Sequence, residues 1–196
     1  MKTEKIICRF RLQFVTLLLM VSMVLPTVMW AAINPTKPSS GDGSSSNPYQ
    51  ISSAAHLYWF AALVNGKLTD GTAKNTAACA KLMNNITVNS GVLKSDGTIN
   101  SGSVSGFTAW TPIGYYNSSS SEYASYNGTF DGNGKTISGL YLDNADMDYI
   151  GLFGFSYGTI QNVGVVDSYF HGKSYIGGIC GFSYGKIMFC YSKSYL

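Results

Sequence analysis

The sequence that decides the fold is a phrase that occurs twice: Tyr149-Ile-Gly-Leu-Phe-Gly-Phe-Ser-Tyr-Gly-Thr-Ile-Gln-Asn-Val163, then Tyr175-Ile-Gly-Gly-Ile-Cys-Gly-Phe-Ser-Tyr-Gly-Lys-Ile-Met-Phe-Cys190. The shared block Gly-Phe-Ser-Tyr-Gly begins at Gly154 and again at Gly181, which gives a period of 27 residues. Repeats of about 20–50 residues are typical of proteins built from stacked units, none of which buries its apolar face alone. Because each copy holds short β-type runs separated by glycines, the repeat predicts an all-β fold of the solenoid type, whose core extends in one direction.

A fainter third copy lies upstream. The sequence Lys135-Thr-Ile-Ser-Gly-Leu-Tyr-Leu142 runs parallel to Gly158-Thr-Ile-Gln-Asn-Val-Gly-Val165. We expect Ile137, Ile160 and Ile187 to mark corresponding points of successive coils.

The composition suits an exported β-rich protein. Of 196 residues, 45% are apolar and only 12% are charged, with 22 glycines and 14 tyrosines. The net charge of +3 comes from residues 1–31, which hold four basic residues and one acidic residue, so that nine of each remain elsewhere. A neutral body has no electrostatic attraction for nucleic acid or anionic lipid. We expect no nucleic-acid partner, and contact with a membrane only through the N-terminal segment if it is not cleaved.

Residues 1–32 have the pattern of a signal-peptide helix. Met1–Arg11 is basic, and the apolar run Phe14–Leu25 is shorter than the roughly 20 residues that span a bilayer. Ala31 and Ala32 form the candidate cleavage site, although the large side chain three residues before the cut fits poorly. An uncleaved signal-anchor is the alternative.

Residues 33–47 are rich in proline, serine and glycine, which predicts a flexible leader. The region 48–125 then begins with a helix over Ile51–Gly66, capped by Ser52 or Ser53 and ended by Asn65-Gly66. We expect this helix to cover the open end of a β-stack with one apolar stripe, formed by Leu57, Phe60, Ala61 and Val64.

The rest of this region is expected to form irregular first coils: a strand within 76–88, a loop at 90–105, a short strand at Trp110–Gly114 and a loop at 115–125. The regular coils are expected over 126–196, with a tight turn at Asp131-Gly-Asn-Gly134.

Taken in order, these phrases resemble the GLUG-motif proteins of bacterial surfaces. Asn47-Pro-Tyr-Gln-Ile-Ser-Ser53 and the helix after it are similar to the family's opening, and Trp110–Gly114 and 126–141 to its first coils. Tyr149-Ile-Gly-Leu-Phe-Gly154 and Tyr175-Ile-Gly-Gly-Ile-Cys-Gly181 are similar to the naming motif. The resemblance implies a parallel β-helix or related β-solenoid on a secreted or surface-attached bacterial protein, as in adhesins and immunoglobulin-A peptidases. Family members usually continue through more coils, so the chain is expected to be truncated.

Catalytic, cofactor and metal sites are not predicted. HExxH is absent, and His56 and His171 lie on unrelated segments. Asp143, Asp146 and Asp148 form the one acidic cluster, interpreted as a solvated turn with a weak calcium site as the alternative. We therefore expect that the chain is not an enzyme.

Three cysteines follow the signal segment: Cys79, Cys180 and Cys190. Because Cys180 and Cys190 match apolar positions of the preceding copy, we expect buried free thiols, with a Cys180–Cys190 bridge as the alternative in an exported protein.

The repeated aromatics are the candidate binding residues: Tyr149 with Tyr175, Phe155 with Phe182, and Tyr157 with Tyr184. Side chains one coil apart would lie about 4.8 Å from each other and form ladders. Ladders inside the stack would be core, whereas ladders outside would be a flat aromatic surface suited to sugar rings. We favour core packing or stabilisation by the ladder over contact with glycans.

The expected function is that of a non-catalytic, exported β-solenoid module, a cell-surface scaffold or adhesin-like binding region. Its expected partner is an extracellular ligand, either a glycan or a host or matrix protein. The alternatives are an accessory fragment of a surface peptidase or polysaccharide-degrading enzyme, or a carbohydrate-binding module.

Overall fold

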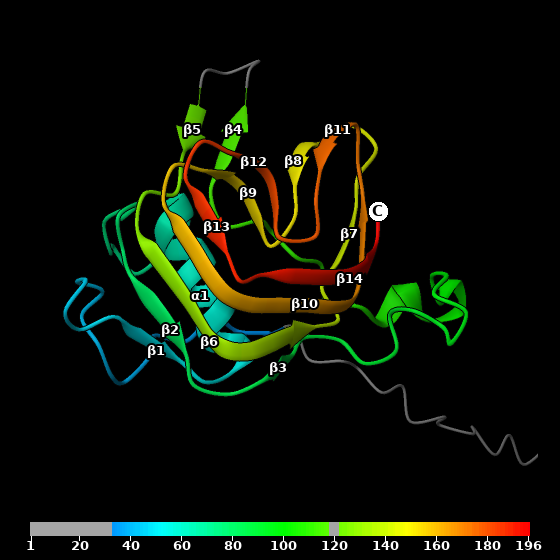
Figure 1. Ribbon diagram of the computed structural model, residues 1–196, viewed down its shortest axis with the longest axis horizontal. Coiled ribbons are helices and arrows are strands. Elements are labelled where there is room, and N and C mark those ends of the chain that lie inside the picture. The colour runs from blue at the N-terminus through cyan, green and yellow to red at the C-terminus, as the bar shows by residue number, and fades with distance from the viewer. Residues whose placement is uncertain (1–32, 118–121) are drawn as a thin grey trace, which may run out of the picture.

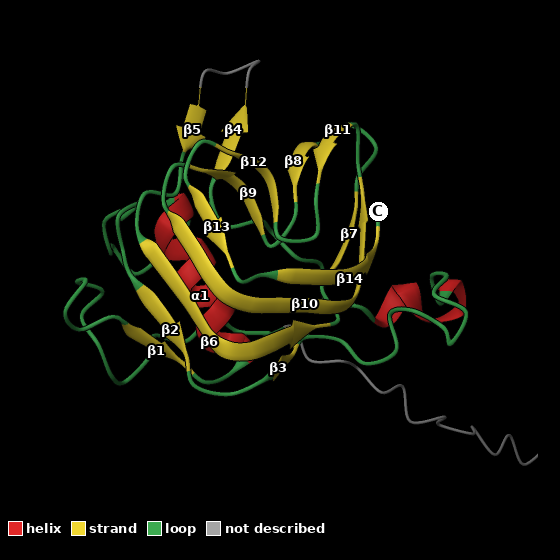
Figure 2. Cartoon of the chain, viewed as in Figure 1, coloured by secondary structure: helices red, strands yellow, loops and turns green. Residues whose placement is uncertain are grey.

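The computed structural model describes residues 33–117 and 122–196, so the signal segment with Ala31 and Ala32 lies outside the described residues. Within them the regular secondary structure is mostly strand, with one long helix, α1 (Ala54–Asn65), and a 3-10 helix at Ser101–Gly106 (Figure 2). The fold is therefore all-β in class.

The strands of the N-terminal part are β1 (Tyr49–Ile51), β2 (Ala80–Leu82), β3 (Ile86–Thr87), β4 (Tyr115–Asn117) and β5 (Glu122–Ala124). A first complete coil follows, made of β6 (Thr129–Ser138), β7 (Tyr141–Asp143), β8 (Asp148–Ile150) and β9 (Phe153–Ser156). The second coil is made of β10 (Thr159–His171), β11 (Ser174–Ile176) and β12 (Cys180–Ser183), and β13 (Lys186–Met188) and β14 (Tyr191–Tyr195) begin another.

Successive coils lie on each other in parallel register. The main sheet has the order β1-β2-β6-β10-β13, with β14 also paired to β10, and β11 and β12 pair with β8 and β9. Ile150 lies beside Ile176, and Phe153 lies beside Cys180. Figure 1 shows that β6, β10 and β13 with β14 nest and bend in the same direction, which curls the sheet.

The expected alignment of the isoleucines is wrong for the first coil. Ile160 pairs with Ile187 on one side but with Phe130 on the other, and Ile137 pairs with Val165. The register shifts because β6 contains two extra residues: the stretch from Asp131 to Lys135 pairs with the shorter stretch from Gln161 to Val163 in β10.

The sequence Asp131–Gly134 is a bend within β6 and not a turn between strands. Asn133 and Gly134 take left-handed backbone conformations, with φ of 53° and 72°. These conformations insert the extra residues and turn the strand, as a bulge does.

Glycines set the close spacing of the coils. A Cβ on Gly158 would lie 2.3 Å from the carbonyl oxygen of Gly128, and a Cβ on Gly185 would lie 1.9 Å from that of Gly158. Glycine recurs at these positions because no other residue lets the backbones approach so closely.

The caps of α1 are as predicted. Ser53 accepts a hydrogen bond from the His56 amide, and Gly66 ends the helix with φ of 67°. Phe60 packs against Tyr126 and Phe130 of the coils, with ring centroids 6.1 and 6.0 Å away. The helix buries more than one stripe, because Trp59 and Leu63 are also buried. Within the described residues, α1 and the other helical segment are too short or too polar to cross a membrane.

Three N-terminal expectations need correction. The expected loop at 115–125 contains the antiparallel pair β4–β5, in which Tyr116 faces Tyr123, because tyrosines favour strands on either side of the serine run. The expected strand at Trp110–Gly114 is only a bridge from Ile113 to Phe153, since Pro112 has no amide hydrogen to donate.

The third concerns residues 33–47, which are held against the body instead of forming a free leader. Amide hydrogens of Thr36 and Gln50 bond the carbonyls of Ala55 and Ser40, and the Cys79 amide bonds Gly43. The composition of this segment did not indicate that it is ordered, because its serine and aspartate side chains are polar and stabilise local turns. Asp42, for example, accepts a hydrogen bond from the Ser44 amide at 2.8 Å.

Candidate functional site

Aromatic side chains of the two coils stack on the outer surface of β8, β9, β11 and β12. The rings of Tyr149 and Tyr175 are parallel within 1°, with centroids 4.8 Å apart. The interplanar angle is 8° at 5.4 Å for Phe155 and Phe182, and 15° at 5.2 Å for Tyr157 and Tyr184. We call these six residues the aromatic ladder.

Within each coil the rings meet edge to face. Tyr149 and Phe155 lie 5.6 Å apart at 83°, and their counterparts Tyr175 and Phe182 lie 5.5 Å apart at 88°. Edge-to-face contacts place the positive ring edge on the negative face, worth about 0.5–1.5 kcal/mol per pair. The ladder is thus a rigid herringbone that positions its own members.

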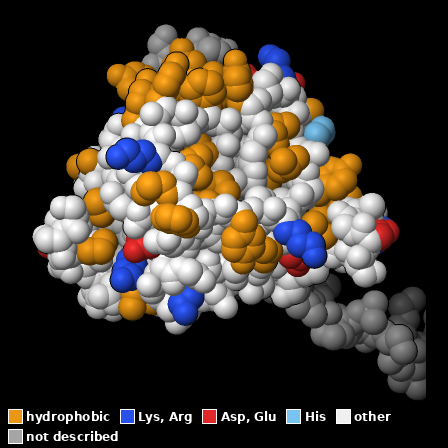
Figure 3. Space-filling view, viewed as in Figure 1, with side chains coloured by type: hydrophobic (Ala, Val, Ile, Leu, Met, Phe, Trp, Pro, Cys, Tyr) orange, Lys and Arg blue, Asp and Glu red, His pale blue; other side chains and the backbone are white. Residues whose placement is uncertain are grey.

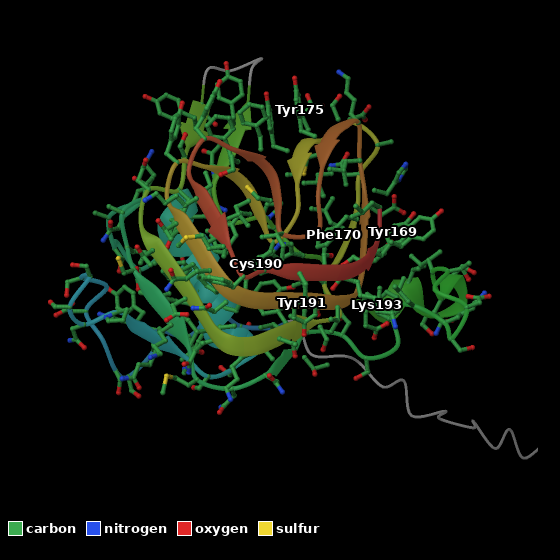
Figure 4. The ribbon with its side chains drawn as sticks, in the orientation of Figure 1. Tyr169, Phe170, Tyr175, Cys190, Tyr191 and Lys193 are labelled. Atoms are coloured by element: carbon green, nitrogen blue, oxygen red, sulfur yellow. The ribbon has the colours of Figure 1, made fainter. Side chains whose placement is uncertain are left out.

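The ladder lies outside the core, so the expectation of core packing is wrong for its tyrosines, whereas the expected stabilisation by stacked rings stays a prediction. Tyr157 and Tyr175 are each 52% exposed and Tyr184 is 67% exposed. Figure 3 shows hydrophobic side chains gathered along the top of the molecule, over β4, β5, β11 and β12, and Figure 4 places Tyr175 on this rim.

Backbone geometry turns two of the tyrosines outward. Tyr149 and Tyr175 occupy equivalent places in β8 and β11, with left-handed φ of 61° and 55°. A non-glycine residue in this region costs about 1–2 kcal/mol. The coil tolerates this cost twice at the same point, which marks the rim as a place where side-chain direction matters.

Tyr116 adds a further ring that the sequence did not indicate. Its ring lies 5.8 Å from Phe155 at 33° and 5.7 Å from Tyr149 at 87°. Tyr116 lies in β4, in the hairpin before the coils, so the repeat pattern of the sequence does not indicate that it joins the ladder. Tyr116 therefore ends the ladder on the side of the earlier chain and is 39% exposed.

A groove of about 470 Å³ borders the ladder at Tyr116. Its lining includes two aromatic rings, two carboxylates and two amines: Tyr115, Tyr116, Asp146, Asp148, Lys67 and Lys173. The Lys67 Nζ lies over the Tyr115 ring, 5.9 Å from its centroid. The volume falls within the range of about 300–1,000 Å³ that is common for ligand pockets.

The acidic cluster predicted from sequence is divided by the structure. Asp143 contacts His171, with Oδ1 2.6 Å from Nδ1, whereas Asp146 and Asp148 line the groove. Asp148 Oδ1 is buried, and no hydrogen-bond donor reaches it from the described residues. Among the described residues, no group of three histidine, cysteine or acidic side chains lies close enough together to hold a metal ion.

The other candidate residues lie away from the ladder. His56 contacts Ser52 near the start of α1. The three cysteines are free, with Cys79 buried and Cys180 and Cys190 only partly buried, because no described strand covers the outer side of the last coil. Burial raises the pKa of the Cys180 thiol from 9.0 to about 12, which leaves it protonated and unreactive at neutral pH.

Comparisons with known proteins do not assign this chain to a family. No protein-family model matches the sequence. No curated protein matches it either. Among solved structures, the chain is similar to one from Bacteroides ovatus named "putative immunoglobulin A1 protease", with 20% identity and a TM-score of 0.49. The match covers 80% of this chain and 40% of that one, so this chain spans less than half of its length. At this level of similarity, no activity or ligand follows for this protein.

Proposed function

We propose that this protein is a non-catalytic, exported β-solenoid module that serves as a cell-surface scaffold and adhesin-like binding region. The signal-peptide pattern of residues 1–32 supports export. The parallel pairing of β6, β10 and β13 supports continuation of the coils as a solenoid, with α1 shielding the first of them.

The observation that carries the binding role is the exposed aromatic ladder. The tyrosines are not needed to fill the interior, where residues such as Phe130, Phe153 and Ile160 are fully buried. Soluble proteins seldom leave a contiguous aromatic surface open unless it contacts something. Tyrosine combines a large apolar ring with a hydroxyl, and this suits extracellular ligands such as glycans or matrix proteins.

The alternative is an accessory fragment of a surface peptidase or polysaccharide-degrading enzyme, or a carbohydrate-binding module. The resemblance to GLUG-motif proteins motivates it. In that case the chemistry would belong to another domain, and the ladder would keep the same contact role.

Binding of the purified protein to a printed glycan array and to immobilised collagen, fibronectin and laminin tests this proposal. The parent is compared with a Tyr157→Ala/Tyr184→Ala double variant, and with Tyr191→Ala as a control for loss of an exposed tyrosine elsewhere, 56% exposed in β14. We expect the parent and the control to bind the same targets and the double variant to bind them at least tenfold more weakly. Equal binding by all three, or no binding by the folded parent, would refute the proposed role of the ladder.

A further inference from the structure

We infer that the groove beside Tyr116 is a saccharide subsite that holds one sugar unit of an extracellular glycan at the end of the aromatic ladder. This inference rests on the proposed binding function and names the ligand class and the place where it is recognised.

The first argument is the geometry of the ladder itself. Sugars stack on the faces of aromatic rings, but Tyr149 and Tyr175 cover each other's faces at 4.8 Å. Between its two coils the ladder therefore offers mainly ring edges and hydroxyl groups. Tyr116 departs from this regular stacking and lines the groove together with Tyr115, so ring surface is available there.

The second argument is the unsatisfied carboxylate. Asp148 lines the groove, and its Oδ1 is buried without a donor among the described residues. A buried acceptor that lacks a hydrogen-bond partner destabilises the folded protein. A ligand hydroxyl that donates to this carboxylate would supply the missing hydrogen bond, and sugars present several hydroxyls around one ring.

The third argument is the charge balance. Asp146, Asp148, Lys67 and Lys173 all line the groove, so the lining carries two charges of each sign. A polyanion or a polycation would gain as much repulsion as attraction there. A neutral sugar uses both signs, because its hydroxyls donate to carboxylates and accept from amines.

Other occupants fit less well. A metal ion would need at least a third ligand, and none is grouped with Asp146 and Asp148 in the part of the chain that the structure describes. A purely apolar ligand would leave the four charged groups of the lining without partners. The volume of about 470 Å³ suits a sugar unit and not a folded partner.

The test is a glycan array followed by titration calorimetry with the oligosaccharide that the array identifies. The groove variants are Tyr116→Ala and Asp148→Ala. Two controls accompany them: Tyr116→Phe retains the ring, and Asp96→Ala removes an exposed carboxylate that accepts hydrogen bonds only from Thr98, in a distant turn. We expect Kd to rise at least tenfold for the two groove variants and less than threefold for Tyr116→Phe and Asp96→Ala. Far-UV circular dichroism and thermal melting verify that each variant is folded.

The possible results separate the two proposals. Glycan binding that survives both groove variants but is lost in Tyr157→Ala/Tyr184→Ala would overturn the subsite and leave the binding module standing. Binding to matrix proteins without any glycan would overturn the saccharide class alone. Absence of all binding by the folded parent would overturn both. If Tyr116→Ala does not fold, Asp148→Ala decides the outcome.

Discussion

Replacing Gly158 by alanine should weaken the stack at its centre. The new Cβ would lie 2.3 Å from the Gly128 oxygen, whereas ordinary contact begins at 3.4 Å, so the two coils must part by about 1 Å. The Thr159 amide bonds Gly128 at 2.9 Å, and the Lys186 amide bonds Gly158 at 2.9 Å. An opening of 1 Å between the Gly128 and Gly158 coils takes the Thr159 bond beyond hydrogen-bonding distance, at about 1–1.5 kcal/mol, and it presses Gly158 toward the coil that holds the Lys186 bond, with lost packing in addition. We expect Gly158→Ala to lower the free energy of unfolding by about 2–4 kcal/mol.

Urea unfolding followed by circular dichroism measures this loss, and Gly102→Ala is the matched control. Gly102 has no atom within 4 Å of the added Cβ, so its replacement should change stability by less than about 1 kcal/mol. Gly185→Ala should fall between them, because the outer coil is free to shift despite a nearer contact of 1.9 Å. A Gly158→Ala midpoint within error of that of Gly102→Ala, with an unchanged slope, would refute the role assigned to the glycines.

Three further changes probe single residues. Phe189→Asn should raise the melting temperature by a few degrees. Phe189 is 84% exposed and has a left-handed φ of 53°, a conformation that asparagine tolerates and that Asn162 adopts at the same place in the preceding coil. An unchanged melting temperature would contradict this. The raised pKa of Cys180 means that the unfolded chain loses the thiol proton above about pH 9 while the fold holds it to about pH 12, so stability falls as the pH rises through this window. At pH 10 the parent should lose about 1 kcal/mol more than Cys180→Ala relative to pH 7, and urea midpoints that fall equally would disprove it. Asn89→Ala should lower the free energy of unfolding, measured in guanidinium, by about 3 kcal/mol. The buried side-chain amide of Asn89 donates to two backbone carbonyls at 2.8–2.9 Å and accepts from the Thr108 amide at 2.8 Å. A loss below about 1 kcal/mol would show that water replaces these hydrogen bonds.

Local signals in the sequence were sufficient for α1 and for the stacking of the coils. Ser53 and Gly66 end the helix by their own chemistry, whatever packs against it. The 27-residue repeat fixes that Phe182 lies over Phe155, since equal sequences at equal places in a coil must coincide. These predictions needed no knowledge of the distant chain.

The side of the ladder could not be predicted from hydropathy, because the usual alternation is inverted. Ser156 is fully buried while Phe155 and Tyr157 on either side are not. Its hydroxyl accepts the Gly158 amide at 3.1 Å, and Ser183 does the same for Gly185 in the next coil. A small polar side chain is thus needed inside to satisfy the bend, which forces its large neighbours outward.

The groove was missed for a different reason, since its walls come from separate parts of the chain. Tyr116 belongs to a hairpin inserted before the coils, Lys67 follows α1, and Asp148 begins β8. No repeat or spacing links these positions, so only the folded chain shows that they meet.

This division between a regular scaffold and an inserted hairpin explains where selectivity should reside. A ladder in which Tyr149 and Tyr175 stack within 1° presents the same edges at every coil, so it can extend a contact but cannot choose between ligands. The hairpin breaks the repeat once, at Tyr116, and there it places a tilted ring beside the unsatisfied Asp148. Binding residues are commonly carried by such insertions because the rigid scaffold holds them without depending on their sequence. Changes in β4 should therefore alter which ligand is bound, whereas changes along the ladder should alter only how tightly.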